Sequence, residues 1–361
     1  MNDFTPFSEW PRWFRLLNTT LLALLIAALL AFVIVSFVVE TPPYDYLLLT
    51  RGANWFCFDN EHFAFGLEQH NYYPAPFYTT FCLPHKYAEP ILRWVWMLAP
   101  VLITIWLARG RAGALAYPPL GVLLLIGQSS WLLLPLFILA ERQRDDRLVP
   151  WWYGLALGLS VLKPQVALVA WLWLVHRWRG QRRVLLMGAL AMTLLALPSF
   201  LLRPGWVFDW LPNGRGFEPV NLASVAFIPV QLGQLGFDPG PVGLAIVWGF
   251  CLLVAFVVYR LLRSWRGQLE FYDWALLFFF VSPVANDYDL VVLLPSIASR
   301  PRRLLLVVTI GIVSWVFAMM TKRWSMSFMV TLVLLILRLW RVDDANEAVP
   351  QTEIRSVPTG G

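Results

Sequence analysis

The chain has 361 residues, of which 59% are hydrophobic and 14% are charged, and its formal net charge is +6. Soluble domains are about half apolar and about a quarter charged, so this composition excludes a soluble enzyme. The apolar residues form continuous runs rather than an alternating pattern, which excludes a transmembrane β-barrel. Most of the positive charge is arginine at the ends of these runs, which is typical of membrane orientation and not of nucleic-acid binding.

The first apolar run, residues 14–39, is too long for the core of a signal peptide and is not followed by a small-residue cleavage site. We therefore expect it to remain as a transmembrane helix. Long apolar runs of this kind predict six clear membrane spans, near residues 14–39, 91–108, 183–202, 240–262, 303–320 and 325–340.

Three further apolar stretches, residues 113–140, 150–176 and 271–299, are interrupted in the middle by polar or helix-breaking residues. Each stretch is either one kinked helix or a hairpin of two short helices. Single spans would place 13 Lys/Arg inside and 14 outside, whereas hairpins place 20 inside and 8 outside. Because cytoplasmic loops are enriched in Lys and Arg, the hairpins are favoured. The fold expected is an all-α polytopic membrane protein with about 12 transmembrane helices, including three short-helix hairpins.

This topology places both termini in the cytoplasm and makes residues 1–342 one transmembrane catalytic domain. Two long segments, 40–90 and 203–239, become extracytoplasmic loops, where function is usually carried. The polar residues 343–361 are expected to form a disordered cytoplasmic tail. The predicted location is a cell membrane, crossed several times, of the bacterial cytoplasmic type.

The hairpin halves are shorter than a membrane is thick. Roughly 13 residues give about 20 Å of helix, whereas the hydrocarbon layer is about 30 Å thick. The three polar turns must therefore lie below the outer surface. Irregular backbone at that depth is tolerated only where it is buried in protein or lines a wet cavity, so the sequence predicts an outward-facing pocket.

Asp45 follows the first span closely, after two prolines that prevent regular helix continuation. A carboxylate at the lipid–water boundary could act as a general base, although it could also simply cap a helix over residues 46–53. The rest of this outer segment is aromatic and polar. Arg51 and Tyr73 in it are candidate substrate-binding residues, since such side chains suit a sugar or a lipid headgroup.

Cys57 and Cys82 share this segment and could pair if it faces an oxidising compartment, but the sequence leaves the pairing open. His62, His70 and His85 lack the tight spacing of a metal-binding motif, so we expect no metal site.

Lys163 is the most informative single residue of the interrupted stretches. A lysine before a proline, within apolar sequence, is costly at membrane depth and indicates function, with a phosphate or another anion as its partner. The alternative is a lysine that extends from a helix end to the membrane surface. Gln128, in the turn of the first interrupted stretch, is a neutral hydrogen-bonding candidate.

The turn of the last interrupted stretch carries Asn286, Asp287 and Asp289. Aspartates in apolar surroundings are expensive unless they are paired, so they either bind across the pocket to a cation such as Lys163 or belong to a solvated turn. Arg215, in a glycine-rich part of the second outer segment, could close over an anionic ligand.

In the order and position of its short motifs the chain resembles the membrane glycosyltransferases of the C superfamily. It is most similar to glycosyltransferase family 87, which uses polyprenyl-phosphate-mannose. The motifs that carry the resemblance are Asp45, Tyr73-Pro74-Ala75-Pro76, Gly127-Gln128, Lys163-Pro164 and Ser282-Pro283. The chain departs from the family at the inserted Ala75, and at Asn286 to Asp289, where relatives often have an aromatic and histidine-bearing segment.

The resemblance implies transfer of a sugar, mannose by analogy, from a polyprenyl-phosphate donor to a hydroxyl group of a lipid or glycan acceptor. Asp45 would take the acceptor proton, and Lys163 would stabilise the departing phosphate, with Arg51 or Arg215. No cofactor and no nucleic acid is expected, and membrane lipids are the other partners. The alternatives are a lipid-linked sugar flippase or other transporter, and a catalytically silent lipid-binding scaffold.

Overall fold

The computed structural model describes residues 12–38, 43–59, 61–65, 73–108, 115, 117–143, 148–213, 224–226, 228–229, 243–298 and 326–339. Every regular element in these ranges is an α-helix or a 3-10 helix (η), which confirms the all-α prediction. The predicted span 303–320 and the tail 343–361 lie outside them, as does most of the outer segment 203–239.

In chain order the elements are α1 (Arg12–Val38), α2 (Tyr44–Phe58), α3 (Ala75–Ala108), α4 (Pro118–Ile126), η3 (Ser130–Leu133), α5 (Leu134–Arg142), η4 (Trp151–Gly154), α6 (Leu155–Gly158), η5 (Leu159–Val161), α7 (Pro164–Arg177), α8 (Arg182–Leu202), α9 (Trp206–Asn213), α11 (Gly243–Arg266), α12 (Phe271–Val281), η7 (Asp287–Leu293), α13 (Leu294–Ala298) and α15 (Met326–Leu339).

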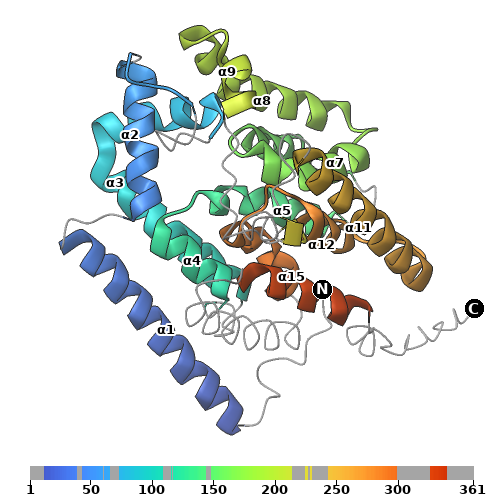
Figure 1. Cartoon of the computed structure of the whole chain (residues 1–361). Helices are drawn as coiled ribbons and strands as arrows, with labels where there is room; N and C mark the ends of the chain where they lie inside the picture. Colours follow the sequence, from blue (N-terminus) through green and yellow to red (C-terminus); the bar gives the residue numbers. More distant parts are fainter. Residues whose placement is uncertain are drawn as a thin grey trace, which may run out of the picture.

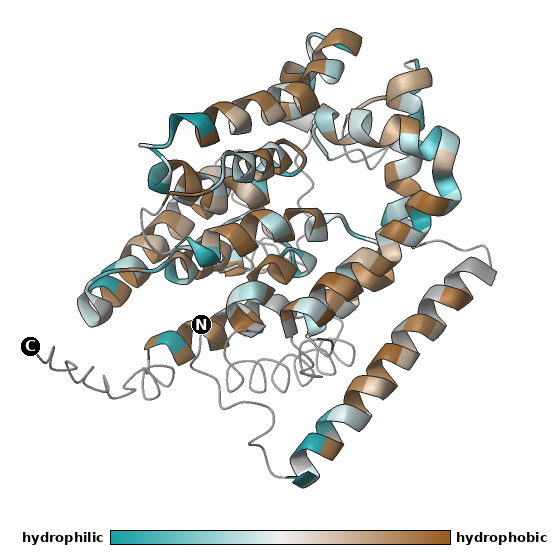
Figure 2. Cartoon of the chain, turned by 180° about the vertical axis from the view of Figure 1, so that it is seen from behind, coloured by the Kyte–Doolittle hydropathy of each residue, from teal (hydrophilic) through white to brown (hydrophobic). Residues whose placement is uncertain are grey.

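Three helices in the described ranges are long and apolar enough to cross a membrane: Ala75–Leu107 in α3, Arg182–Leu202 in α8 and Ala245–Trp265 in α11. Large apolar side chains are exposed along all three, and Figure 2 shows hydrophobic ribbon on their outward faces. Such faces are stable in lipid and costly in water, which indicates membrane association. The twelve-crossing topology remains a prediction.

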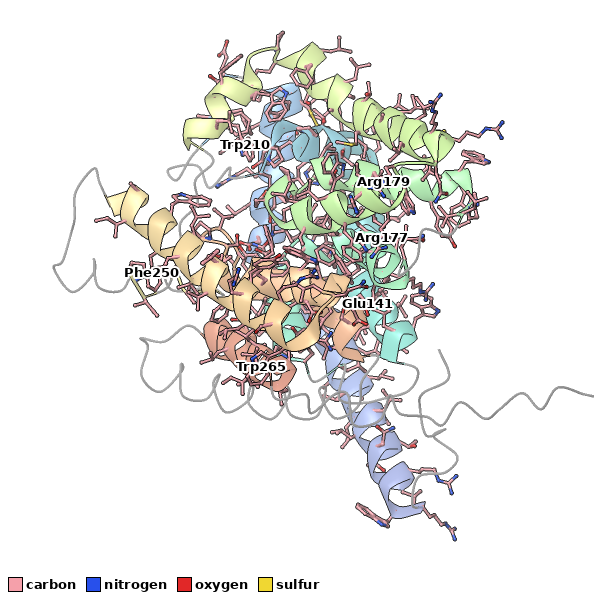
Figure 3. All side chains as sticks on the ribbon, turned by 90° about the vertical axis from the view of Figure 1, so that its right-hand side faces the viewer. Glu141, Arg177, Arg179, Trp210, Phe250 and Trp265 are labelled. Atoms are coloured by element: carbon pink, nitrogen blue, oxygen red, sulfur yellow. A yellow bond between two sulfur atoms is a disulfide. The ribbon has the colours of Figure 1, made fainter. Side chains whose placement is uncertain are left out.

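In the view of Figure 1, α1 and α11 both run from the upper left towards the lower right, while α2 and α9 lie in the upper part. α1 lies at the edge of the molecule and exposes many apolar side chains. Figure 3 shows three residues near the ends of α5 and α7 on one side of the view: Glu141, Arg177 and Arg179. Trp210 of α9 lies away from them.

The predicted outer segment 40–90 is largely helical, since it contains α2 and the first part of α3. α3 starts earlier than the predicted span because its first part packs along α2. It is kinked at Ala88, where the backbone is not helical, two residues before Pro90. Pro90 has no N–H to donate to the preceding turn, which is a usual cause of a kink. A disulfide between Cys57 and Cys82 joins α2 to α3 and resolves the pairing that the sequence left open.

A close packing of α6 against α8 holds the chain just before Lys163. A Cβ atom at Gly154 would lie 2.1 Å from the backbone oxygen of Val184, and one at Gly158 would lie 2.8 Å from Cβ of Ala191. Glycines four residues apart allow two helices to approach closely, as is common in membranes. Gly154 and Gly158 have this Gly-x-x-x-Gly spacing.

We expect Gly154→Ala to destabilise the protein, because the added methyl group cannot fit against the α8 backbone without separating the helices. Overpacking of this kind costs about 1–3 kcal/mol. The measurement is the thermal unfolding midpoint in detergent. The matched control is Gly249→Ala in α11, where a Cβ atom meets nothing within 4 Å. An unchanged midpoint for Gly154→Ala would contradict the close packing.

The three interrupted stretches are broken at the predicted residues. α4 ends at Gly127, whose positive φ of 76° favours glycine. Lys163 separates η5 from α7, and its backbone is not helical (φ −149°, ψ 69°), in keeping with the restriction that a following proline places on the helical conformation. The third break runs from Ser282 to Asn286, between α12 and η7. The predictions of these breaks are confirmed.

The helix α15 is joined to α12 by a buried ion pair between Arg338 and Asp273. Arg338 binds Asp273 through two contacts, Nε–Oδ1 at 2.5 Å and Nη2–Oδ2 at 3.1 Å, and its Nη2 also lies 3.2 Å from Glu270. A two-contact pair of this kind fixes the orientation of both side chains. It ties the last described helix to the helix that leads into the third break.

Candidate functional site

The three breaks meet at one group of polar side chains, joined there by Asp45 and Tyr73. We call this group the central polar cluster. It consists of Asp45, Tyr73, Gln128, Ser130, Lys163, Tyr288 and Asp289. The packing of η7 against α4 and η3, and of η3 against η5, brings these separate segments together.

Lys163 lies inside the protein. Only 4% of the residue is exposed, and its Nζ lies 2.7 Å from Oδ1 of Asp289. It also donates a hydrogen bond of 2.8 Å to the hydroxyl oxygen of Ser130. This position excludes the alternative in which Lys163 extends from a helix end to the membrane surface. The expectation that an aspartate of the last turn binds Lys163 is confirmed for Asp289.

Two aromatic rings complete the surroundings of the Lys163 ammonium. Nζ lies 4.7 Å from the ring centre of Tyr288 and 5.6 Å from that of Tyr73, both within the range of cation–π attraction. The Tyr73 ring is itself held by stacking on Phe77, with ring centres 4.0 Å apart. The ammonium therefore has a carboxylate, a hydroxyl group and two ring faces around it.

Asp45 joins the cluster through Gln128. The side-chain amide of Gln128 donates to Oδ2 of Asp45 and accepts a hydrogen bond of 2.6 Å from the Tyr73 hydroxyl. Asp45 lies in the first turn of α2 and is only half-buried, whereas Gln128 is buried. These hydrogen bonds link Asp45, the more accessible carboxylate of the cluster, to Tyr73, whose ring lies beside Lys163.

Gly127 explains how the turn before Gln128 comes so close to Asp45. A Cβ atom at Gly127 would lie 2.6 Å from Cβ of Pro43 and 3.2 Å from Cβ of Tyr46, so only glycine allows this approach to the start of α2. Trp96 of α3 donates a hydrogen bond of 2.8 Å to the Gly127 carbonyl oxygen. The Gly127-Gln128 motif thus sets the geometry of the candidate base.

Asn286 and Asp287, predicted to bind substrate, have described contacts within their own turn. Asn286 and Asp289 form a reciprocal capping box at the start of η7, and the Asn286 amide donates to the Tyr288 hydroxyl at 2.8 Å. Oδ1 of Asp287 accepts from the backbone N–H of Tyr288. Their binding role stays a prediction, and the turn that they shape is the one that presents Tyr288 and Asp289.

Of the two arginine candidates, Arg51 lies within the described residues and is not part of the cluster. Arg51 is exposed on α2, and its guanidinium lies 4.8 Å from the ring centre of Trp55 on the same helix. Arg215 lies outside the described residues.

Two members of the cluster, Ser130 and Tyr288, were missed by the sequence reasoning, and Asp289 was considered but not selected. The signal for Ser130 was its place two residues after Gln128 in a polar interruption of apolar sequence. Tyr288 lies between two aspartates in the last turn. Neither residue type is unusual in a turn, so only the packing identifies them.

In the described part of the chain, no group of three or more His, Cys, Asp or Glu side chains could hold a metal ion. His62 instead lies 2.7 Å from the exposed Asp59, and this hydrogen bond raises the pKa of His62 above its ordinary value. His70 lies outside the described residues.

Comparison with known proteins gave no match to a family model, to a curated protein or to a solved structure.

Proposed function

We propose that the chain is a membrane glycosyltransferase that moves a sugar, mannose by family analogy, from a polyprenyl-phosphate donor to a hydroxyl acceptor. The observation that carries the proposal is the convergence of Asp45, Gln128 and Lys163, from three separate segments, in one polar cluster. A candidate base at the half-buried edge and a buried cation linked to it through Gln128 and Tyr73 are the two groups that such a transfer requires.

The motifs behind the resemblance to glycosyltransferase family 87 support the proposal by their placement. Asp45, Tyr73, Gln128 and Lys163 belong to four of the five motifs, and all four side chains are members of the central polar cluster. The fifth motif, Ser282-Pro283, opens the break that leads to Asp289. Short motifs that are weak one by one gain weight when their side chains meet.

The proposed reaction is one displacement at the anomeric carbon. Asp45 accepts the proton of the acceptor hydroxyl, and the oxygen forms a new bond to that carbon. The bond from the carbon to the phosphate oxygen breaks, and its electron pair leaves with the polyprenyl phosphate, which gains negative charge. Lys163 stabilises that charge. Attack opposite to the leaving group inverts the anomeric configuration.

Two observations and one prediction from the sequence support the proposal of an extracytoplasmic site reached from the lipid. The Cys57–Cys82 disulfide lies beside the segment that carries Asp45, and disulfides persist in oxidising compartments. The sequence predicts that the loops rich in Lys and Arg lie on the cytoplasmic side, opposite to the segment that carries Asp45. The outward faces of α3, α8 and α11 are apolar, so a donor with a lipid tail can approach through the membrane.

A lipid-linked sugar flippase is the second candidate, because a buried carboxylate–lysine pair at membrane depth also occurs in transporters. The two functions differ in covalent chemistry. A transferase breaks the sugar–phosphate bond, whereas a flippase returns the donor intact on the other side.

The experiment reconstitutes the purified full chain in liposomes with a short-chain polyprenyl-phosphate mannose labelled in the sugar, and with octyl mannoside as the acceptor. We expect labelled octyl dimannoside and free polyprenyl phosphate in equal amounts. Intact donor that moves between leaflets without product would favour the flippase. Neither product nor movement would contradict both functions.

A further inference from the structure

We propose that Asp289 is a positioning residue that holds the Lys163 ammonium in place and aims it at the phosphate of the donor. This inference rests on the proposed function and assigns a separate task to each carboxylate of the cluster. Asp45 exchanges a proton with substrate, whereas Asp289 acts only through Lys163.

The two oxygens of Asp289 have different partners. Oδ2 accepts a hydrogen bond of 3.0 Å from the backbone N–H of Asn286, which fixes the carboxylate to the start of η7. Oδ1 faces Lys163 at 2.7 Å and accepts a hydrogen bond of 2.5 Å from the Ser130 hydroxyl. One oxygen is therefore anchored to the backbone while the other orients the cation.

Lys163, Ser130 and Asp289 form a closed triangle of contacts. The Ser130 hydroxyl donates to Asp289 and accepts from Lys163, so its hydrogen and its lone pair are both used. An ammonium group has three N–H donors, and the described residues engage two of them. The third donor is available for an oxygen of the leaving phosphate.

Burial separates the tasks of the two carboxylates. Asp289 is 1% exposed and lies against a cation, so it is shielded from an acceptor hydroxyl. Asp45 is half-buried in the first turn of α2 and is the more accessible of the two. An accessible carboxylate suits proton transfer, and a shielded one suits a permanent counter-ion.

The need for such a counter-ion follows from the environment of Lys163. A buried ammonium without a partner is strongly disfavoured, so Lys163 needs an anionic neighbour to keep its place in the cluster. The groups that face this ammonium are Asp289, Ser130, Tyr73 and Tyr288, with Asp45 beyond Gln128. Asp289 is the one carboxylate among the described residues in direct contact with it.

The test is a double-mutant cycle in the transfer assay, with turnover expressed per folded molecule. We expect Asp289→Asn and Lys163→Ala each to lower turnover by about 10²-fold, the usual effect of removing one electrostatic stabiliser. The double variant should be no more than about 3-fold slower than Lys163→Ala, because Asp289 acts through Lys163. Asp289→Glu, which keeps the charge, should regain part of the loss.

The matched control is Asp273→Asn, which removes a buried carboxylate from the ion pair with Arg338. We expect it to lower stability but to leave turnover per folded molecule unchanged. Wild-type turnover in folded Asp289→Asn, or losses that multiply in the double variant, would overturn the positioning role.

Failure of the proposed function gives a different result. If the wild-type chain transfers no sugar, the transferase and the positioning role fall together. The thermal unfolding midpoints of the wild type, the two single variants and the double variant then show whether Lys163 and Asp289 form only a structural pair. In that case the double variant loses less stability than the sum of the losses in the two single variants.

Discussion

Asp45→Asn is expected to abolish sugar transfer while the protein still folds and inserts. The amide cannot accept the acceptor proton, and the loss of a general base usually costs about 10²–10⁴-fold in rate. Asn keeps the size of the side chain and an oxygen that can accept from Gln128, so the hydrogen bond in the cluster can persist. The measurement is the initial rate of product formation from polyprenyl-phosphate mannose.

The matched control for this variant is Asp59→Asn. Asp59 directly follows the last residue of α2, at the end of the helix opposite to Asp45, where it is paired with His62. We expect wild-type rates for the control. Full activity of Asp45→Asn would remove the assignment of Asp45 as the base and would leave the cluster without a proton acceptor at its accessible edge.

Lys163→Ala is expected to lower kcat/KM for the donor by about 10²–10³-fold, since the charge that develops on the leaving phosphate loses its cation. The substitution also leaves Asp289 buried without its partner, which destabilises the protein. Rates are therefore compared per folded molecule, and the double variant Lys163→Ala/Asp289→Asn removes both charges at once.

Lys86→Ala is the control for loss of a lysine. Lys86 is exposed on α3, and its ammonium lies over the rings of Phe58 and Tyr87. We expect no change in kcat/KM for this control. A Lys163→Ala enzyme with an unchanged rate at limiting donor concentration would argue against a role for Lys163 in phosphate recognition.

Two buried ion pairs among the described residues show why a buried charge alone does not define a site. Arg338 and Asp273 are as buried as Lys163 and Asp289. Arg338 and Asp273, however, lie within regular helices, and Glu270 directly precedes one of them. Lys163 lies at a helix break, and Asp289 lies in the first turn of η7, directly after another break. The central polar cluster also contains an accessible carboxylate, and this combination is what points to chemistry.

The sequence by itself predicted the helical class, most of the described long helices and the three breaks. These features depend on short-range physics: apolar runs form helices in lipid, and proline or a glycine with positive φ ends a helix at a particular residue. The predicted start of the second span at residue 91 differs from the structure, in which α3 begins at Ala75. Packing against α2 and the disulfide extend it, and neither is visible in local hydropathy.

The sequence also determined which polar residues stand at the breaks, and it indicated that a cation such as Lys163 needs a carboxylate partner. Only the tertiary structure decided that the partner is Asp289, that Ser130 bridges the two, and that Gln128 connects Asp45 to Tyr73. Ser130 and Asp289 are 159 positions apart in the chain. Local preferences act over a few residues, whereas contacts at this separation depend on how whole helices pack, and that packing selected one aspartate from a turn that offers two.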